Sequence, residues 1–384
     1  MSEWKEKPLS DLAILCNDSW KVGDEECSYI ALENIEEGKL RLSGIGHSGI
    51  VTSNKYRFNE KNFLFGKLRP YFRKVVRPQF NGICSTDIWV VSARGETDLT
   101  FLFYLFANQE FVDLAYSGSS GTKMPRADWN FMKNTVWFIP SNIEEQRAIA
   151  SVLSSLDDKI DLLHRQNQTL EAMAETLFRQ WFVEEAEGGW EGCTLNDLCT
   201  QIASGGTPST KIESYYNGNI DWYSTKELKD NFLYESENKI TNEGLENSSA
   251  KLFPAGTVVI AIYAAPTVGR LGILANEASF NQAACGFIAN EELCCSEFIY
   301  LHLKNQRDEL NLMASGSAQQ NLNVGKIKSY PAFKVPKDLM NKFKDAIQPN
   351  FKKINGNTLQ IRNLEKLRDT LLPKLMSGEV RVEI

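Results

Sequence analysis

A heptad pattern between residues 143 and 185 constrains this chain more than any other feature. Mostly apolar side chains recur there at alternating steps of four and three residues. They are Ile149, Leu153, Leu156, Ile160, Leu163, Asn167, Leu170, Ala174, Leu177 and Trp181. Because neither Pro nor Gly interrupts the segment, it predicts one helix of about 40 residues, roughly 60 Å long. A helix with such an apolar seam needs a partner.

Capping signals mark both ends of this helix. Ser141 follows Pro140, and Glu144 stands three residues after Ser141. This spacing is typical of a capping box, in which two side chains satisfy amides of the first helical turn. Gly188 and Gly189 predict the end of the helix.

The C-terminal part of the chain supplies the partner helix. A shift of 194 residues lays residues 353–371 on residues 159–177, with matching Lys-Ile, Leu-Glu and Thr-Leu pairs. The two segments carry Asn167 and Asn357 at seam positions. Asn in a seam costs stability but can fix register and orientation; the alternative is that both seams are merely imperfect.

Three helix-breaking residues distinguish the second helix from the first. Pro349 and Gly356 lie inside it, and Pro373 lies near its end. An interior Pro removes a backbone hydrogen bond. We therefore expect this helix to begin after Pro349 or bend there, to end or kink at Pro373, and to differ in length from the first.

The start of the chain recurs in its second half. Trp4, Leu9, Asp11 and Leu12 reappear 186 residues later as Trp190, Leu195, Asp197 and Leu198. Each half then shows short β-rich pieces, a helical stretch, a Gly/Ser loop and a seam helix. The β-rich pieces are residues 29–32, 63–65, 88–91 and 136–139, then 222–223, 257–263 and 286–289, and the helical stretches are residues 99–115 and 296–313. The pattern predicts an α+β protein of two similar mixed α/β lobes and a two-helix coiled coil, with an internal pseudo-two-fold repeat.

The composition argues against several classes of protein. The net charge of -7 argues against a uniformly basic coat but leaves room for a local basic face. The eight Cys form no CxxC pair and the three His are far apart, so no zinc-site spacing can be assembled. The N-terminus lacks the apolar core of a signal peptide, and no apolar run is long enough to span a bilayer. We expect a cytoplasmic protein with no membrane partner.

Motifs of catalysis are missing from the sequence. It contains no phosphate-binding P-loop, dinucleotide fingerprint, HExxH, GxSxG or methyltransferase-like NPPY or DPPY motif. The pattern therefore favours a binding protein without a catalytic or metal site of its own. An unfamiliar active site, such as that of a nuclease, is the alternative.

A basic stretch in the first lobe combines cations with aromatic rings. Residues 61–77 hold six basic and no acidic residues, interleaved with Phe and Tyr. Such a mixture suits a phosphate backbone and base edges, and the residues we select are Lys67, Arg69, Tyr71 and Arg73. The alternative is an exposed strand edge that Lys and Arg protect from pairing.

A Gly/Ser loop occupies the same place in each lobe. Residues 117–126 match residues 314–323. The first loop offers Lys123 and Arg126, which suit guanine, and the second offers Gln319 and Gln320, which suit adenine. Different donors at equivalent positions are what two readers of different sequences need, although plain turns are the alternative.

A third loop, residues 204–211 of the second lobe, carries small hydroxyls and amides suited to phosphates. We select Thr207, Ser209 and Lys211 from this loop, together with Arg270 further along the lobe. An ordinary Pro-Gly turn is the alternative.

The chain resembles the DNA specificity subunits of type I restriction-modification systems over nearly its whole length. The resemblance is carried by the motifs PSNIEEQRAIASVLSSLDDKIDLL, AETLFRQWFVEE, GGTPST and LLPKLMSGEVRV and by the duplicated lobe starts. It implies target recognition domains at residues 1–140 and 187–336, with conserved coiled-coil helices at residues 141–186 and 337–384. It also implies that each domain reads half of an interrupted DNA site and that the two helices are antiparallel.

The resemblance implies partners and cofactors as well. The expected partners are double-stranded DNA, two methyltransferase (modification) subunits and, in the full complex, restriction subunits. No cofactor is expected in this chain, because S-adenosylmethionine, and ATP with Mg for restriction, would belong to the partner subunits. For the partner interface we select Phe178, Trp181 and Phe182, with Leu375 and Met376 opposite; closure of the coil end is the alternative role.

Two rival functions remain open at this point. A scaffold could use the lobes and the coil to join protein partners without touching DNA. A specificity subunit could also serve a methyltransferase alone, without a restriction subunit.

Overall fold

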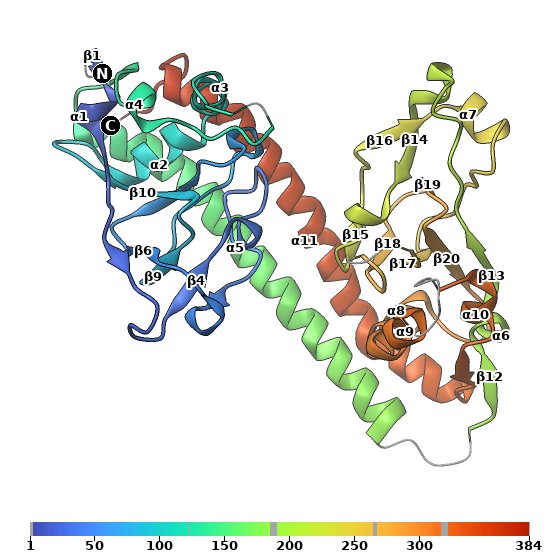
Figure 1. Ribbon diagram of the computed structural model, residues 1–384. Helices are drawn as coiled ribbons and strands as arrows, with labels where there is room; N and C mark the ends of the chain where they lie inside the picture. The colour runs from blue at the N-terminus through green and yellow to red at the C-terminus, as the bar shows by residue number, and fades with distance from the viewer. Residues whose placement is uncertain (1–2, 122, 185–189, 264–266, 316–321, 384) are drawn as a thin grey trace. The chain divides into compact units, whose positions relative to one another are not determined.

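The computed structural model describes residues 3–121, 123–184, 190–263, 267–315 and 322–383. It divides into two compact units, Met1–Asp161 with Arg362–Ile384, and Leu162–Ile361. Each unit contains one lobe and one stretch of each long helix (Figure 1). Both units mix helices and sheets, so the predicted α+β class is confirmed.

The first long helix is α5 (Ile143–Arg179), which continues as a π-helical turn, Gln180–Glu184. Its predicted seam is buried or half-buried throughout, which confirms the helix read from the heptads. The predicted capping box is wrong by one residue: the Asn142 side chain accepts the Glu144 amide at 2.9 Å. The Ser141 hydroxyl instead donates to the Glu3 carbonyl at 2.6 Å, which ties the helix start to the N-terminal segment. The glycines predicted to end the helix lie outside the described residues.

The second long helix, α11 (Lys337–Ser377), runs for 41 residues. The expected start after Pro349 and end at Pro373 are therefore wrong. Both Pro side chains face solvent, while their neighbours Phe351 and Leu372 are 3% and 1% exposed. Burial of these neighbours offsets the hydrogen bond that each Pro removes. The expected inequality in length also fails, since α5 and its π-helical turn hold 37 and five residues.

The two long helices run antiparallel within each unit. In the first unit, Ile149 and Leu153 of α5 share a core with Leu372 and Met376 of α11. In the second unit, α5 residues near its C-terminal end pack on the N-terminal part of α11; they are Ala174 and Phe178, against Met340, Phe343 and Ile347. The helix pair thus forms part of the hydrophobic core of each lobe.

A buried amide pair joins the two helices in the second unit. The Asn357 side-chain amide donates to Asn167 Oδ1 at 2.8 Å and to Gln166 Oε1 at 2.9 Å. Asn357 is 1% exposed. A one-turn slip would break this pair and leave a polar group in the core without a partner. The contact therefore supports a register role for the two seam Asn residues over an imperfect seam.

The first lobe holds three sheets and its own helices. The sheet orders are β1-β11, β2-β10-β7-β8 and β3-β6-β9-β4-β5. The strands are β1 (Trp4–Pro8), β2 (Ala13–Leu15), β3 (Ser19–Trp20), β4 (Ser28–Ile30), β5 (Gly46–His47), β6 (Lys55–Phe58), β7 (Phe63–Gly66), β8 (Val75–Val76), β9 (Gly82–Cys84), β10 (Ile88–Ala93) and β11 (Val136–Pro140). The α-helices are α1 (Leu9–Leu12), α2 (Leu99–Ala107), α3 (Gln109–Ser117) and α4 (Trp129–Met132), and short 3-10 turns cover Leu32–Asn34, Ser48–Ile50 and Pro70–Phe72. The predicted helix at residues 99–115 is thus two helices that break at Asn108.

The second lobe repeats this plan. The sheet orders are β12-β21, β13-β20-β17-β18-β15 and β16-β14-β19. The strands are β12 (Gly192–Thr194), β13 (Cys199–Ser204), β14 (Tyr216–Tyr223), β15 (Asn231–Leu233), β16 (Asn238–Ile240), β17 (Val258–Ala261), β18 (Leu271–Leu274), β19 (Ser279–Phe280), β20 (Ala284–Ala289) and β21 (Pro331–Phe333). The α-helices are α6 (Leu195–Leu198), α7 (Asn242–Glu246), α8 (Ser296–Asn305), α9 (Arg307–Ser315) and α10 (Val324–Lys328), and 3-10 turns cover Glu213–Tyr215 and Thr225–Glu227. Because β2-β10-β7-β8 and β13-β20-β17-β18 share one order, the internal repeat is confirmed at the level of topology.

Among the helices that the structure describes, none has the length and apolar character that crossing a bilayer requires.

A buried histidine should make the second lobe sensitive to acid. His302 of α8 stacks on Phe298, and burial lowers the pKa of its imidazole from 6.5 to about 4. The folded state favours the neutral form of His302. The contribution of His302 to the free energy of unfolding is therefore complete above pH 6.5 and is lost as the pH falls towards 4. The loss should reach about 3 kcal/mol. Denaturant titrations from pH 7 to 4 should show it in the wild type and not in His302→Phe.

Replacement of the exposed His47 of the first lobe by Gln is the matched control, and it should leave the wild-type pH profile in place. Parallel profiles for the wild type and His302→Phe would contradict the prediction.

Candidate nucleic-acid interface

Two loops that are 50 residues apart in sequence meet in the first lobe. The basic loop, residues 67–74, joins β7 to β8, and the Gly/Ser loop, residues 117–126, follows α3. The Arg69 amide donates to the Pro125 carbonyl at 2.7 Å, and the Lys67 carbonyl accepts the Ala127 amide at 2.9 Å. The two sequence candidates therefore form one surface.

The backbone of the basic loop is bent at two non-glycine residues. Arg69 and Arg73 have φ values of 51° and 46° on either side of the 3-10 turn Pro70–Phe72. Such left-handed conformations cost about 1–3 kcal/mol each and persist only where surrounding contacts hold them. The basic loop therefore has a defined backbone conformation that its surrounding contacts hold.

Several selected side chains of the first lobe remain available to a ligand. Lys123 is exposed and Lys67 is half-buried. The Arg69 side chain is half-buried; its Nε atom has no hydrogen-bond partner within the described residues but is enclosed by the fold, so this atom is not itself open to a ligand. The Tyr71 ring is 44% exposed and meets the Tyr116 ring at 5.4 Å between centroids. Cations beside an exposed aromatic pair suit a nucleic acid.

Arg126 has a partner in the same lobe. Its Nε atom donates to Asp87 Oδ1 at 3.0 Å, and this bond raises the pKa of the guanidinium. Asp87 also accepts the Lys67 amide through its carbonyl oxygen at 2.9 Å. Arg126 therefore binds the start of β10, where the two loops meet.

Three further cations of the basic stretch are bound inside the fold. Arg73 Nη2 lies 3.0 Å from Asp369 Oδ1, Lys74 Nζ donates to the Leu32 carbonyl at 2.8 Å, and Arg77 Nη1 donates to Thr100 Oγ1 at 2.5 Å. The selection of Arg73 as a DNA contact is not supported, because its guanidinium points into the fold. Lys74 and Arg77 flank β8, which is an edge strand of its sheet. The alternative of a strand edge protected by Lys and Arg therefore fits the C-terminal half of residues 61–77.

The second lobe holds an equivalent pair of loops. The Ile262 amide donates to the Ala283 carbonyl at 2.8 Å, and the Ile262 carbonyl accepts the Leu322 amide at 3.1 Å. Lys67 makes the same two backbone bonds in the first lobe, with Asp87 and Ala127. Leu322, at the described end of the second Gly/Ser loop, therefore occupies a position equivalent to that of Ala127 in the first lobe. Gln319 and Gln320 lie outside the described residues, and the side chain of Arg270 is half-buried.

The third loop reaches the same end of the second lobe. Thr207 Oγ1 hydrogen-bonds to the side chain of Gln282, beside β20, while Ser209 and Lys211 are exposed. A Cβ atom on Gly205 would lie 2.0 Å from the Phe280 carbonyl oxygen. Close backbone packing thus explains this glycine, which agrees with the plain-turn alternative. Ser209 and Lys211 remain available for a ligand.

The side chains selected for a partner interface are inside the lobes. Phe178 and Phe182 are 2% and 3% exposed in the core of the second unit, and Trp181 packs against the same core. Leu375 and Met376 are buried in the first unit. They do not lie opposite Phe178, whose neighbour on α11 is Phe343. Burial favours the alternative role of closing the coil ends.

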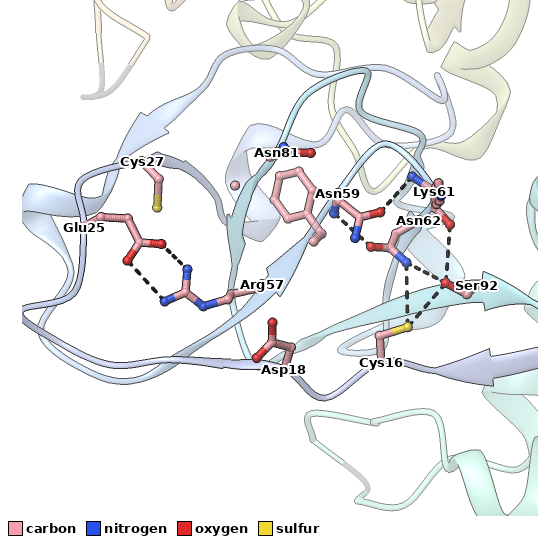
Figure 2. A pocket seen from close by; sticks show the side chains of 12 residues that line it. Cys16, Asp18, Glu25, Cys27, Arg57, Asn59, Lys61, Asn62, Asn81 and Ser92 are labelled. Carbon is pink, nitrogen blue, oxygen red and sulfur yellow. Dashed lines mark hydrogen bonds and ion pairs between the residues drawn. The ribbon is translucent and has the colours of Figure 1, made fainter.

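Sequence reasoning missed a polar pocket of about 600 Å³ in the first lobe (Figure 2). It lies at the end of β10, beside Ser92, whereas the basic loop is held at the start of that strand. The Asn62 amide donates to Ser92 Oγ at 2.6 Å, and Arg57 pairs with Glu25. Its polar groups thus largely satisfy one another. The described residues hold no cluster of three His, Cys, Asp or Glu that could bind a metal ion.

Comparisons with known proteins point to one family. The model of the type I restriction modification DNA specificity domain matches residues 1–172 and 187–341. The MjaIX specificity subunit of Methanocaldococcus jannaschii is 28% identical over 74% of this chain and 69% of its own length. The HindI specificity subunit of Haemophilus influenzae is 23% identical over 99% of this chain and 100% of its own length.

A solved structure shares the fold. The S subunit of a type I restriction-modification system from M. genitalium superposes with a TM-score of 0.59 at 15% identity, covering 100% of this chain and 97% of that one.

Proposed function

The chain belongs to the type I restriction-modification DNA specificity family, and we propose that each of its lobes reads one half of an interrupted DNA site. It is a recognition subunit rather than an enzyme. Catalysis is the task of the partner subunits.

The joined loops of the two lobes are the observation that supports this proposal. In each lobe the residue that follows the central strand, Lys67 or Ile262, accepts a backbone hydrogen bond from the C-terminal side of the Gly/Ser loop, donated by Ala127 or Leu322. The side chains of these loops differ, because the first lobe has Lys67, Arg69 and Lys123, whereas the second has Ile262 at the position of Lys67 and carries Gln319 and Gln320 in its Gly/Ser loop. Equivalent surfaces with different donors select different bases, so the recognised site is asymmetric.

The coiled coil acts as a spacer in this proposal. A rigid connection between two readers requires half-sites a fixed number of base pairs apart. The Asn167–Asn357 contact supports a single register of the helix pair, because Asn357 Nδ2 would lose both of its acceptors after a slip.

Two modification subunits and, in the full complex, restriction subunits are the proposed protein partners. The outer face of α5 in the second unit supports a partner surface there. Leu162 and Met173 are 50% and 51% exposed, and a hollow of about 810 Å³ lies over residues 165–177. S-adenosylmethionine would be bound by the modification subunits, and ATP with Mg by the restriction subunits.

Methylome sequencing tests the proposal directly. DNA from cells that express the chain with its modification subunit should carry a new bipartite methylated-adenine motif. Cells expressing either protein alone should lack it. If the two proteins co-purify and no motif appears, the scaffold function replaces DNA recognition.

A further inference from the structure

A short segment of the first lobe, residues 38–39, lies between the basic loop and helix α11. The Gly38 amide donates to the Phe72 carbonyl at 3.1 Å. The Gly38 carbonyl accepts Arg73 Nη2 at 2.6 Å and Arg368 Nη2 at 3.4 Å. Beside it, Lys39 Nζ lies 2.5 Å from a carboxylate oxygen of Glu365. The segment therefore bridges the loop to the helix.

Arg73 itself also reaches the helix. Its Nη2 atom lies 3.0 Å from Asp369 Oδ1, and its side chain is 14% exposed. One nitrogen thus serves two acceptors within the fold, and Asp369 compensates its charge. This placement leaves Arg73 poorly suited to a phosphate.

The anchor on α11 is built on a fully buried guanidinium. The Arg368 side chain is 0% exposed, and its Nη1 lies 2.8 Å from Asp157 Oδ1 of α5. The hydroxyl of Tyr104, on α2, donates to Asp157 Oδ2 at 2.7 Å. Polar contacts therefore run without a break from α2 through both long helices to the basic loop.

The second lobe shows why the first needs this anchor. Its equivalent loop has Gly269 at φ +80°, where the first lobe has Arg73 at φ 46°. The residue that follows each of them makes the same backbone bond, since the Arg270 carbonyl accepts the Ala261 amide at 2.9 Å and the Lys74 carbonyl accepts the Gly66 amide at 2.8 Å. Glycine adopts this conformation without strain, whereas Arg does so at a cost.

We infer that Arg73 is a positioning residue, which fixes the shape of the basic loop through Asp369 and Gly38 so that Lys67 and Arg69 meet the DNA. This inference rests on the proposed function and replaces the direct contact predicted from the sequence. It makes Asp369, a residue of the coiled coil, a determinant of how the first lobe reads its half-site.

Loss and conservative replacement of the Asp369 carboxylate distinguish positioning from direct contact. The variants are Asp369→Ala, Arg73→Ala and Asp369→Glu, which keeps a carboxylate beside Arg73 and Arg368, and the control is Glu379→Ala, which breaks an exposed ion pair near the end of α11. Each is assembled with the modification subunit. Affinity for a duplex carrying the methylome motif is measured between 50 and 200 mM salt.

Asp369→Ala and Arg73→Ala should each weaken binding about tenfold, because the strained loop loses its anchor. The slope of log affinity against log salt should stay unchanged, and Asp369→Glu should keep most of the affinity. A fall of about 0.9 in the slope for Arg73→Ala would show a lost phosphate contact and overturn the inference. Wild-type affinity in Asp369→Ala would overturn it too.

Hydrogen exchange on the free full-length chain separates this inference from the proposed function. The Phe72 and Arg73 amides, which donate to Arg69 and Pro70 carbonyls at 3.0 and 2.8 Å, should lose protection in Asp369→Ala and keep it in Asp369→Glu. Unchanged protection in Asp369→Ala would overturn the positioning role. A wild-type complex that binds no duplex would overturn the proposed function instead.

Discussion

Replacing Lys67, Arg69 and Lys123 together by Ala should weaken binding of the assembled complex to its target duplex about 100-fold or more. These are the cations of the first-lobe surface for which the described contacts include no ion pair. Each lost phosphate contact should reduce the salt slope by about 0.9, so three should reduce it by up to about 2.7. Fluorescence anisotropy between 50 and 200 mM salt measures both quantities.

A matched variant controls for net charge. Lys7, Lys21 and Arg94 belong to the same lobe, lie outside the two joined loops and outside residues 61–77, and make no ion pair within the described residues. Their replacement by Ala removes the same three charges, and we expect a change of less than about threefold because charges beyond a Debye length are screened. Equal losses in the two triple variants would mean that the joined loops have no special role.

The loss should also be confined to one half of the site. Base substitutions in the half-site read by the first lobe should matter less in the triple variant, while substitutions in the other half-site should cost about 1–3 kcal/mol per base pair as before. Uniform relaxation at both half-sites would contradict separate reading by the two lobes.

The sequence predicted the elements of the fold well because their signals are local. The seam of α5 depends on residues three and four apart, and the duplicated lobe starts are visible in a simple shift of the sequence. The helix start was misplaced by one residue because Ser141 and Asn142 are both good caps. Only the contact between Ser141 and Glu3, 138 residues away, decides between them.

The expectation that Leu375 and Met376 lie opposite Phe178 was wrong for a different reason. The shift of 194 residues identifies equivalent positions of the two helices, but equivalent positions in an antiparallel pair lie at opposite ends of it. Leu375 therefore belongs to the same core as Ile149 and Leu153, whereas Phe178 packs against Phe343. Sequence similarity alone does not show this.

The site was predicted only in part because polar side chains gain their roles from distant partners. The six cations at residues 61–77 are chemically alike, yet three are bound within the fold and the others are not. Arg73 turns inward because Asp369 lies nearby, although 296 residues separate them in sequence. Spacing within the basic stretch carries no record of that contact.

Replacing Arg368 by Met should lower the free energy of unfolding of the first unit by about 3–5 kcal/mol. Arg368 is fully buried and is the ion-pair partner of Asp157. Burial raises the pKa of the Asp157 carboxyl, and the nearby guanidinium opposes that shift. Without Arg368, Asp157 would remain half-buried beside Tyr104 with no ion-pair partner to compensate its charge.

Denaturant unfolding, with the second unit as an internal reference, measures this loss. A triple variant, Tyr104→Phe with Asp157→Leu and Arg368→Met, removes the whole polar group and should recover most of the stability, because apolar replacement of a complete buried ion pair is often neutral. If Arg368→Met alone costs less than about 1 kcal/mol, the network does not hold the first lobe on the coil. If the triple variant is as unstable as the single one, the loss in free energy of unfolding comes from altered packing around residue 368 and not from the uncompensated charge of Asp157.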